Sequence, residues 1–139
     1  TVGYHHALNM AINFPIQSIA ADVTGAALWD VERALLAEAG LTYCEYYQAL
    51  LEQQRNILTT GCDRGIMLRQ SQLINEIHDE LTLDLCPDNM KRDIEIIIET
   101  MRAVPSLHIL LPGFDVPLDV EAKIGNHWTE GEQIINTSM

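Results

Sequence analysis

The sequence predicts an α+β fold in which helices cover one face of a small antiparallel sheet. Apolar residues recur at three- and four-residue steps in some segments, which predicts helices, and alternate with polar residues in others, which predicts strands. The 139 residues, 47% of them hydrophobic, match the size of one domain with one core. We expect a single domain over residues 1–139, in the order helix, helix, strand, strand, helix, strand.

The first predicted helix follows Pro15 and ends near Gly40. Its apolar stripe consists of Ile16, Ile19, Val23, Ala27, Val31 and Leu35. Proline suits the first turn of a helix, and glycine suits the position just after the last turn. We therefore expect an amphipathic helix of five or six turns that begins at Pro15.

Residues 41–65 predict a second, shorter helix followed by a loop. The apolar positions of this helix are Tyr43, Tyr46, Tyr47, Leu50 and Leu51. Their three- and four-residue steps place them on one side of a helix, so that at least part of this face must be buried. Gly61, Asp63 and Gly65 then indicate a loop.

A hairpin is predicted next, with arms at residues 73–77 and 81–85. The second arm alternates Leu81, Leu83 and Leu85 with polar residues, which favours a strand with one buried face. The three polar residues between the arms, His78, Asp79 and Glu80, are expected to form the turn.

The last two predicted elements are a helix and a strand. Asp88 is a candidate cap for a helix whose stripe is Met90, Ile94, Ile97, Ile98 and Met101, and Pro105 ends it. Residues 118–124 alternate apolar and polar side chains and predict a final strand.

Charge and cysteine content limit the classes of function. Eight basic and 20 acidic residues give a net charge of −12, which disfavours a free-standing nucleic-acid-binding module. Such a surface fits a metal-binding protein or one part of a larger assembly. Three cysteines without CxxC spacing indicate a reducing, cytoplasmic environment, and no apolar run approaches the ~18 residues of a membrane span. The chain starts at Thr1, which we interpret as a processed or trimmed end, or as part of a longer protein.

The predicted turn carries the residues best suited to chemistry. Asp79 and Glu80 are adjacent carboxylates, and a divalent cation beside them would relieve their repulsion. Mg²⁺ takes one or two carboxylates together with waters and substrate phosphates. For an isolated His-Asp-Glu sequence, solvation of a polar turn is the commoner explanation.

Three segments together resemble family A DNA polymerases, the bacterial polymerase I-like and phage enzymes. Residues 75–81, Asn-Glu-Ile-His-Asp-Glu-Leu, resemble the motif C hairpin of the palm. Residues 13–22, Asn-Phe-Pro-Ile-Gln-Ser-Ile-Ala-Ala-Asp, are similar to the family's Asn-x-Pro-Ile/Met-Gln-Gly-x-Ala-Ala-Asp helix start. Residues 116–121, Val-Pro-Leu-Asp-Val-Glu, with Gly125 and Trp128, are similar to its closing motif. The three matches occur in the family's order.

This resemblance implies a palm-type antiparallel sheet and specific residue roles. Asp79 matches the carboxylate that binds catalytic Mg²⁺, and Glu80 matches a supporting acid beside the metals. His78 matches a residue near the primer end, and Asn13 and Gln17 match polar residues facing the duplex minor groove. Primer–template DNA and deoxynucleotides would be the partners. The resemblance also implies a bacterial cell as the location, with a phage-encoded gene as one interpretation. Capping and solvation are the alternative for Asn13 and Gln17.

The chain also departs from the family pattern. Ser18 stands where glycine is common, and Asn9 stands where a basic residue is usual. The interval from Asp22 to His78 is roughly twice the family's, which predicts an insertion near 41–65. Its apolar face would cover the outside of the palm or dock on a neighbouring chain, and we expect docking if the polymerase is assembled from separate pieces.

Motif A and the fingers have no match in this sequence, and no lysine precedes Lys91. Two-metal phosphoryl transfer needs a second palm aspartate. We therefore expect the C-terminal palm portion of a DNA polymerase that needs an upstream segment with fingers, thumb and motif A, either linked or separate. The alternatives are a non-catalytic remnant or structural subunit that keeps the palm fold, and a free-standing metal-dependent nuclease.

Overall fold

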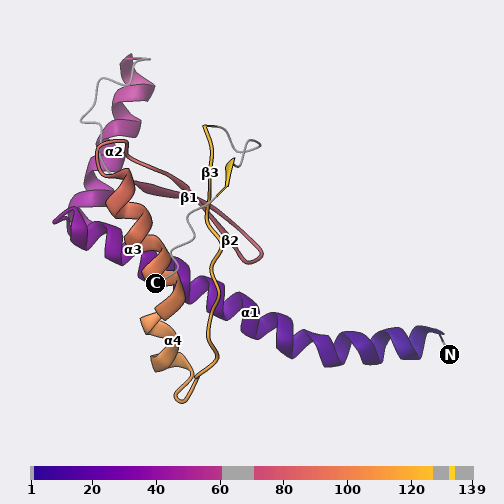
Figure 1. Cartoon of the computed structure of the whole chain (residues 1–139). Coiled ribbons are helices and arrows are strands. Elements are labelled where there is room, and N and C mark those ends of the chain that lie inside the picture. Colours follow the sequence, from indigo (N-terminus) through magenta and orange to yellow (C-terminus); the bar gives the residue numbers. More distant parts are fainter. Residues whose placement is uncertain (1, 61–70, 127–131, 134–139) are drawn as a thin grey trace.

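A computed structural model of the chain describes residues 2–60, 71–126 and 132–133. It confirms the α+β class: helices pack beside a two-stranded antiparallel hairpin, with a second, very short strand pair near the C-terminus (Figure 1). The elements are, in order, α1 (Val2–Glu38), α2 (Tyr43–Thr60), β1 (Gln72–Ile77), β2 (Glu80–Asp84), α3 (Met90–Ala103), α4 (Pro105–Leu110), β3 (Lys123–Ile124) and β4 (Glu132–Gln133). No helix in these ranges is both long enough and apolar enough to cross a bilayer.

Helix α1 is much longer than predicted, and Pro15 lies inside it. The expectation that the helix begins at Pro15 is therefore wrong. The preceding residues are mostly good or neutral helix formers, so that the helix extends through the proline at the loss of one backbone hydrogen bond. Residues 3–22 are all exposed, which also contradicts burial of Ile16 and Ile19. The predicted end is confirmed, because Gly40 follows the helix with a φ of 67°.

The core forms where the C-terminal half of α1 crosses α3 and α4. One cluster joins Val31 and Leu35 of α1 to Ile96 and Ile97 of α3. Half-buried hydrophobic residues pack against this cluster, among them Leu81, Leu83, Leu85 and Met101. The predicted alternation of β2 and the predicted stripe of α3 are thus confirmed where they meet α1.

A second cluster lies between α1 and α4. It joins Ala26 and Ala27 to Val104 and Leu107, and Val23, Phe114 and Leu118 pack against it. Asp30 of α1 strengthens this contact, because its carboxylate accepts hydrogen bonds from the Ser106 amide at 2.8 Å and the Ser106 hydroxyl at 2.5 Å. The sequence did not predict α4, a short helix held by these distant partners.

Helix α3 begins at Met90 with Asn89 as its N-cap residue, so that the predicted cap at Asp88 is wrong. It ends before Pro105, as predicted, and Val104 joins it to α4. Val104 has a φ of 34°, which is uncommon for a β-branched residue, and is almost fully buried. Its burial in the core offsets the cost of this backbone conformation.

The predicted strand over 118–124 is wrong for most of its length. Among residues 118–124, only Lys123 and Ile124 form a paired strand, β3, whose partners are Glu132 and Gln133 of β4. Leu118 instead packs on the cluster between α1 and α4. Alternation of side chains was insufficient here because a strand also needs a neighbour for its backbone groups. Trp128 lies outside the described residues.

Helix α2 is confirmed, and its first turn carries a reciprocal cap. The Thr42 amide donates to the Glu45 carboxylate at 2.8 Å, and the Glu45 amide donates to the Thr42 hydroxyl at 3.3 Å. The Thr42 amide and the Thr42 hydroxyl both donate to the Glu45 carboxylate, and these two hydrogen bonds hold the pKa of Glu45 below its usual value. The predicted loop from Gly61 to Gly65 lies outside the described residues.

An aromatic cluster attaches the start of α2 to α1. Trp29 stacks on Tyr43 with 5.3 Å between ring centroids, Tyr43 stacks on Tyr47 at 6.2 Å, and Tyr46 is buried. The Tyr47 hydroxyl donates to the Glu32 carboxylate at 3.3 Å. Tyr43 and Tyr46 therefore cover α1 of their own chain, whereas Tyr47 and Leu51 of the same face are exposed, and docking of this face on a neighbouring chain stays a prediction.

This cluster should weaken in alkaline solution. Burial, followed by the negative charge of Glu32, raises the pKa of Tyr43 to about 12 from its ordinary value of 10.0. A raised pKa means that the folded state favours the neutral phenol, so that the stabilisation is complete below pH 10 and is lost as the pH rises towards 12. We expect the near-ultraviolet circular dichroism of the cluster to decline over this interval.

Tyr43→Phe should reduce that decline, because the phenylalanine ring keeps the stacking and has no proton to lose. It should also leave the protein as stable or slightly more stable at neutral pH, since the buried Tyr43 hydroxyl has no hydrogen-bond partner among the described residues. Tyr4→Phe, at an exposed tyrosine far along α1, is the matched control. An unchanged alkaline transition in Tyr43→Phe would contradict this prediction.

Candidate catalytic hairpin

The candidate site is the turn between β1 and β2, which contains two residues rather than the predicted three. Ile77 pairs with Glu80, so that His78 and Asp79 form the turn and Glu80 is the first residue of β2. Two-residue connections are the commonest hairpin turns, and both of their favoured types need a positive φ at the first position. His78 supplies it, with a φ of 56°, where glycine is usual. A histidine held in this conformation is a feature often found at functional sites.

The side chains of His78, Asp79 and Glu80 are all exposed. No hydrogen bond or ion pair joins them to another residue within the described ranges. Strand β1 also contains a bulge at Ile74, because the register shifts between Leu73 and Asn75. Bulges increase local twist and often lie near active sites. The hairpin therefore presents two adjacent carboxylates at its tip, and no basic side chain of the described residues pairs with them.

The base of the hairpin is fixed by a buried hydrogen-bond network that the sequence analysis missed. Ser71, just before β1, donates its hydroxyl proton to the Asp93 carboxylate of α3 at 2.5 Å. The amide of Cys86, two residues after β2, donates to the same Ser71 oxygen at 2.8 Å. Ser71 and Asp93 are both buried. One side chain thus ties both ends of the hairpin to the start of α3.

A sequence signal for this network did exist. Asp93 precedes Ile97 by four residues, and it therefore lies on the apolar face of α3, where a charged residue is rare. A buried aspartate requires donors, and Ser71 and its neighbours were candidates. The pairing itself could not be inferred, because the partners are 22 residues apart.

Asn13 and Gln17 lie on a different element from the hairpin. Both are in the exposed half of α1, and their four-residue spacing places them on the same face of the helix. No hydrogen bond joins either of them to the hairpin in the described structure. The structure thus brings Asp79, Glu80 and His78 together, but it leaves Asn13 and Gln17 apart from them.

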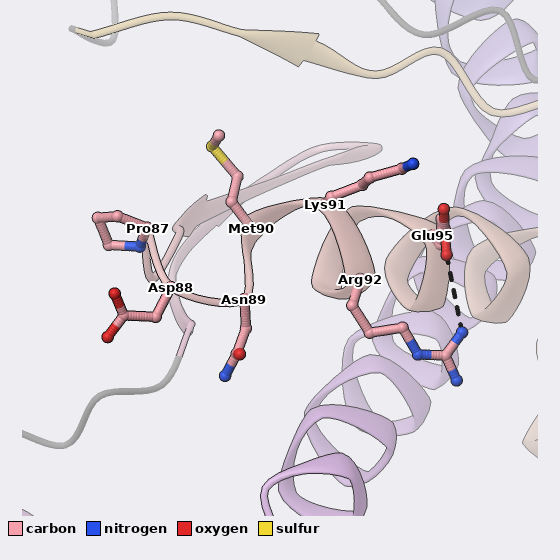
Figure 2. Close-up of a pocket in the computed structure, with 7 residues that line it drawn as sticks. All are labelled: Pro87, Asp88, Asn89, Met90, Lys91, Arg92 and Glu95. Carbon is pink, nitrogen blue, oxygen red and sulfur yellow. Dashed lines mark ion pairs between the residues drawn. The ribbon is translucent and has the colours of Figure 1, made fainter.

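A shallow hollow at the start of α3 lies near the base of the hairpin and not at its tip. It is lined by residues 87–92 and Glu95, and Figure 2 shows Arg92 turned towards Glu95, with a nitrogen–oxygen distance of 3.7 Å. Arg92 also pairs with Glu38 at 3.3 Å. Because both acids already neutralise this arginine, and no predicted site residue lines the hollow, it is not the candidate site.

The donor set at the hairpin tip fits part of a magnesium site. Asp79 and Glu80 provide the oxygen ligands that Mg²⁺ prefers, and one or two carboxylates suffice when substrate phosphates and waters complete the shell. Across the described residues, no group of three or more histidine, cysteine or acidic side chains is placed to hold a metal ion. A site with two metals would therefore need a further carboxylate from elsewhere.

A comparison with known protein families identifies the family of the chain. The profile of DNA polymerase family A matches residues 3–130, which is nearly the whole chain. The chain belongs to DNA polymerase family A. No curated protein and no solved structure gives a significant match. The resemblance found in three short segments is thus confirmed at the level of the family, and a function related to DNA polymerase follows.

Proposed function

We propose that this chain is the C-terminal palm portion of a template-directed DNA polymerase, with an insertion at residues 41–65. The observation that carries the proposal is the placement of Asp79 and Glu80, which are exposed at the tip of a hairpin whose base is tied to α3. Carboxylates that must meet a substrate need this combination of free side chains and a rigid support.

Asp79 and Glu80 would hold the Mg²⁺ ions together with an aspartate from an upstream segment. The bound metal would supply charge stabilisation for transfer of a nucleotide to the primer 3′-hydroxyl. Asp79 is the metal ligand in this proposal, and Glu80 supports it from the adjacent position. The chain's own contribution is to hold both carboxylates exposed at the tip of the hairpin, where the triphosphate and the primer end would enter.

The remaining predicted residues would contact DNA. His78 lies beside Asp79 in the turn and would meet the primer end. Asn13 and Gln17 carry amides, which both donate and accept hydrogen bonds and so suit the degenerate pattern of the minor groove. Since the chain carries a net charge of −12, most phosphate contacts would come from the fingers and thumb of the upstream segment.

Primer extension tests this proposal directly. The chain would be assayed alone and after mixing with a separately produced polypeptide that carries the fingers, thumb and motif A aspartate from the same genome. We expect extension of a labelled primer only in the mixture, because one acidic pair cannot hold two metals. Robust extension by the chain alone would contradict the dependence on a second segment.

A further inference from the structure

The sequence of the β1–β2 hairpin is compatible with two pairing registers. In the structure, Leu73 lies opposite Leu83, and Ile74 is an extra residue of β1 before the pairing resumes towards the turn. Without this bulge, the pairing next to the turn would continue unbroken, and Ile74 would lie opposite Leu83. The turn itself is the same in both registers, and only the start of β1 shifts by one residue.

This shift would turn each side chain at the start of β1 to the other face of the hairpin, because the side-chain period of a strand is two. In the structure, Ser71 and Leu73 share the face of Leu83, which packs on the core cluster of α1 and α3. In the bulge-free register, Gln72 and Ile74 would take this face, and Ser71 would turn away from α3. The two registers therefore differ in which residues of β1 meet the core.

Hydrophobic burial does not choose between these registers. Each places an aliphatic side chain of the same size opposite Leu83, which is Leu73 in the structure and Ile74 in the bulge-free register. The bulge also interrupts the regular ladder of backbone hydrogen bonds, which by itself favours the bulge-free register. A specific contact must therefore favour the bulge.

Ser71 supplies the contact that the bulge-free register would lose. Its hydroxyl donates to the buried Asp93 carboxylate at 2.5 Å and accepts from the Cys86 amide at 2.8 Å. A buried polar group that loses its partner is strongly unfavourable, and here two such groups depend on one side chain. Gln72 would face α3 in the bulge-free register, but the Cys86 amide would still lose its acceptor. The hydrogen bonds of Ser71 therefore favour the bulged register.

The bulge also determines where the tip of the hairpin points. A bulge bends its strand and increases the local twist, and bulges beside active sites re-aim side chains in this way. Asp79 lies in the turn beyond the bulge, and Figure 1 shows the hairpin extending from its base beside α3 to this turn. Loss of the bulge would therefore redirect the Asp79 carboxylate relative to α1 and α3, although the turn keeps its own geometry.

We propose that Ser71 and Asp93 are positioning residues that select the bulged register of the hairpin and thereby aim Asp79 at the metal and the primer end. The aiming of Asp79 rests on the proposed function, whereas the selection of the register does not. Ser71 and Asp93 are buried at the base of the hairpin, so that they act through the strand and not by contact with the reacting groups.

Nuclear magnetic resonance of the isotope-labelled chain tests the selection of the register. In the unaltered chain, nuclear Overhauser effects should join backbone protons of Leu73 to those of Leu83. Ser71→Ala should weaken these effects and produce contacts of Ile74 with Leu83 instead, because the hydroxyl that favours the bulge is gone. Ser71→Thr keeps the hydroxyl and should keep the original pattern, which makes it the matched control.

A second variant covers the case in which Ser71→Ala does not fold. The double variant Ser71→Ala, Asp93→Ala removes the buried charge together with its donor, and it should show the same shift of register. The original pattern of Overhauser effects in either folded variant would overturn the selection of the register by these residues.

Primer extension by the assembled polymerase tests the aiming of Asp79. Deletion of Ile74 removes the bulge and leaves Ser71 beside Asp93. It should lower the extension rate at least about tenfold and raise the Mg²⁺ concentration that gives half the maximal rate, because a misplacement of about 1 Å can cost about a hundredfold. Ile74→Ala keeps the bulge at this exposed position and should stay within about twofold of the unaltered chain.

Asp79→Asn distinguishes failure of the aiming from failure of the proposed function. If Asp79→Asn abolishes extension but deletion of Ile74 leaves the rate unchanged, the polymerase site stands and the aiming by the bulge is wrong. If extension persists in Asp79→Asn, the polymerase site is wrong, and the aiming fails with it. The selection of the register is then still decided by the Overhauser effects, which do not depend on polymerase activity.

Discussion

Replacement of Asp79 by asparagine in the assembled polymerase is expected to lower the rate of primer extension about a thousandfold while the fold is retained. Asparagine keeps the size of the side chain but removes the negative charge that a divalent cation requires. Stabilisation of transition-state charge by a metal contributes several kcal/mol, and each 1.36 kcal/mol corresponds to a factor of ten in rate. Asp79 is exposed and lies in a turn, where asparagine is well tolerated.

The matched control is Asp84→Asn, which makes the same change at the other end of β2. Asp84 is also exposed, pairs with Gln72 at the base of the hairpin, and lies far from the turn. Asp79 and Asp84 are five residues apart, which corresponds to about 17 Å along an extended strand. Asp84→Asn should therefore leave the extension rate within about twofold of the original. Glu80→Gln should give an intermediate loss, because Glu80 supports the site from the neighbouring position.

The same measurement decides between catalysis and a structural role. If the chain is a remnant that keeps the hairpin for folding only, Asp79→Asn will extend primers as fast as Asp84→Asn. The thermal unfolding midpoints of both variants must match that of the unaltered chain, so that a loss of rate reports chemistry and not unfolding.

The hairpin was predictable because its signals are local. Leu81, Leu83 and Leu85 alternate within five residues, and the polar turn that precedes them is adjacent in sequence. Helix α3 was predictable for the same reason, since Ile94, Ile97 and Ile98 recur within a few residues. Each pattern reports burial of one face, and the structure places both faces against α1.

The sequence predictions were wrong where contacts between residues far apart in the sequence decide the structure, or where a predicted strand has no neighbour to pair with. Pro15 has the properties of a helix start, but its position inside α1 depends on the helix formers that precede it. Helix α4 depends on Asp30, which lies 76 residues away from Ser106. The tyrosines of α2 were correctly placed on one face, but only the fold reveals that Trp29 of the same chain stacks on it.

The candidate site also combines residues that a local sequence pattern predicts with residues that only the fold brings together. Asp79, Glu80 and His78 were identified from a short contiguous motif, and the structure places them in one turn. The support beneath them, from Ser71 and Asp93, left only the weak signal of an acid on an apolar face. A site's reacting groups are thus easier to predict from sequence than the contacts that hold them in place.

A second large effect is expected from loss of the hydrogen-bond network of Ser71 and Asp93 that supports the hairpin. Ser71→Ala is expected to lower the free energy of unfolding by about 3 kcal/mol, because two hydrogen-bonded groups lose their partner at once. Loss of a hydrogen bond to a charged group costs about 1.5–3 kcal/mol, and an unsatisfied buried amide costs about 1–3 kcal/mol. The affected groups are the Asp93 carboxylate and the Cys86 amide, which both form a hydrogen bond with the Ser71 hydroxyl.

Urea unfolding followed by circular dichroism would measure this change, with Ser18→Ala as the control. Ser18 is exposed on α1, so that its replacement should alter the unfolding free energy by less than about 0.5 kcal/mol. Asp93→Asn should cost less than Ser71→Ala, because its amide oxygen still accepts from the Ser71 hydroxyl and the Cys86 amide keeps its acceptor. In the double variant Ser71→Ala, Asp93→Asn the losses should be less than additive, since the two residues share one hydrogen bond. Additive losses, or a Ser71→Ala variant as stable as Ser18→Ala, would show that the network does not hold the hairpin on α3.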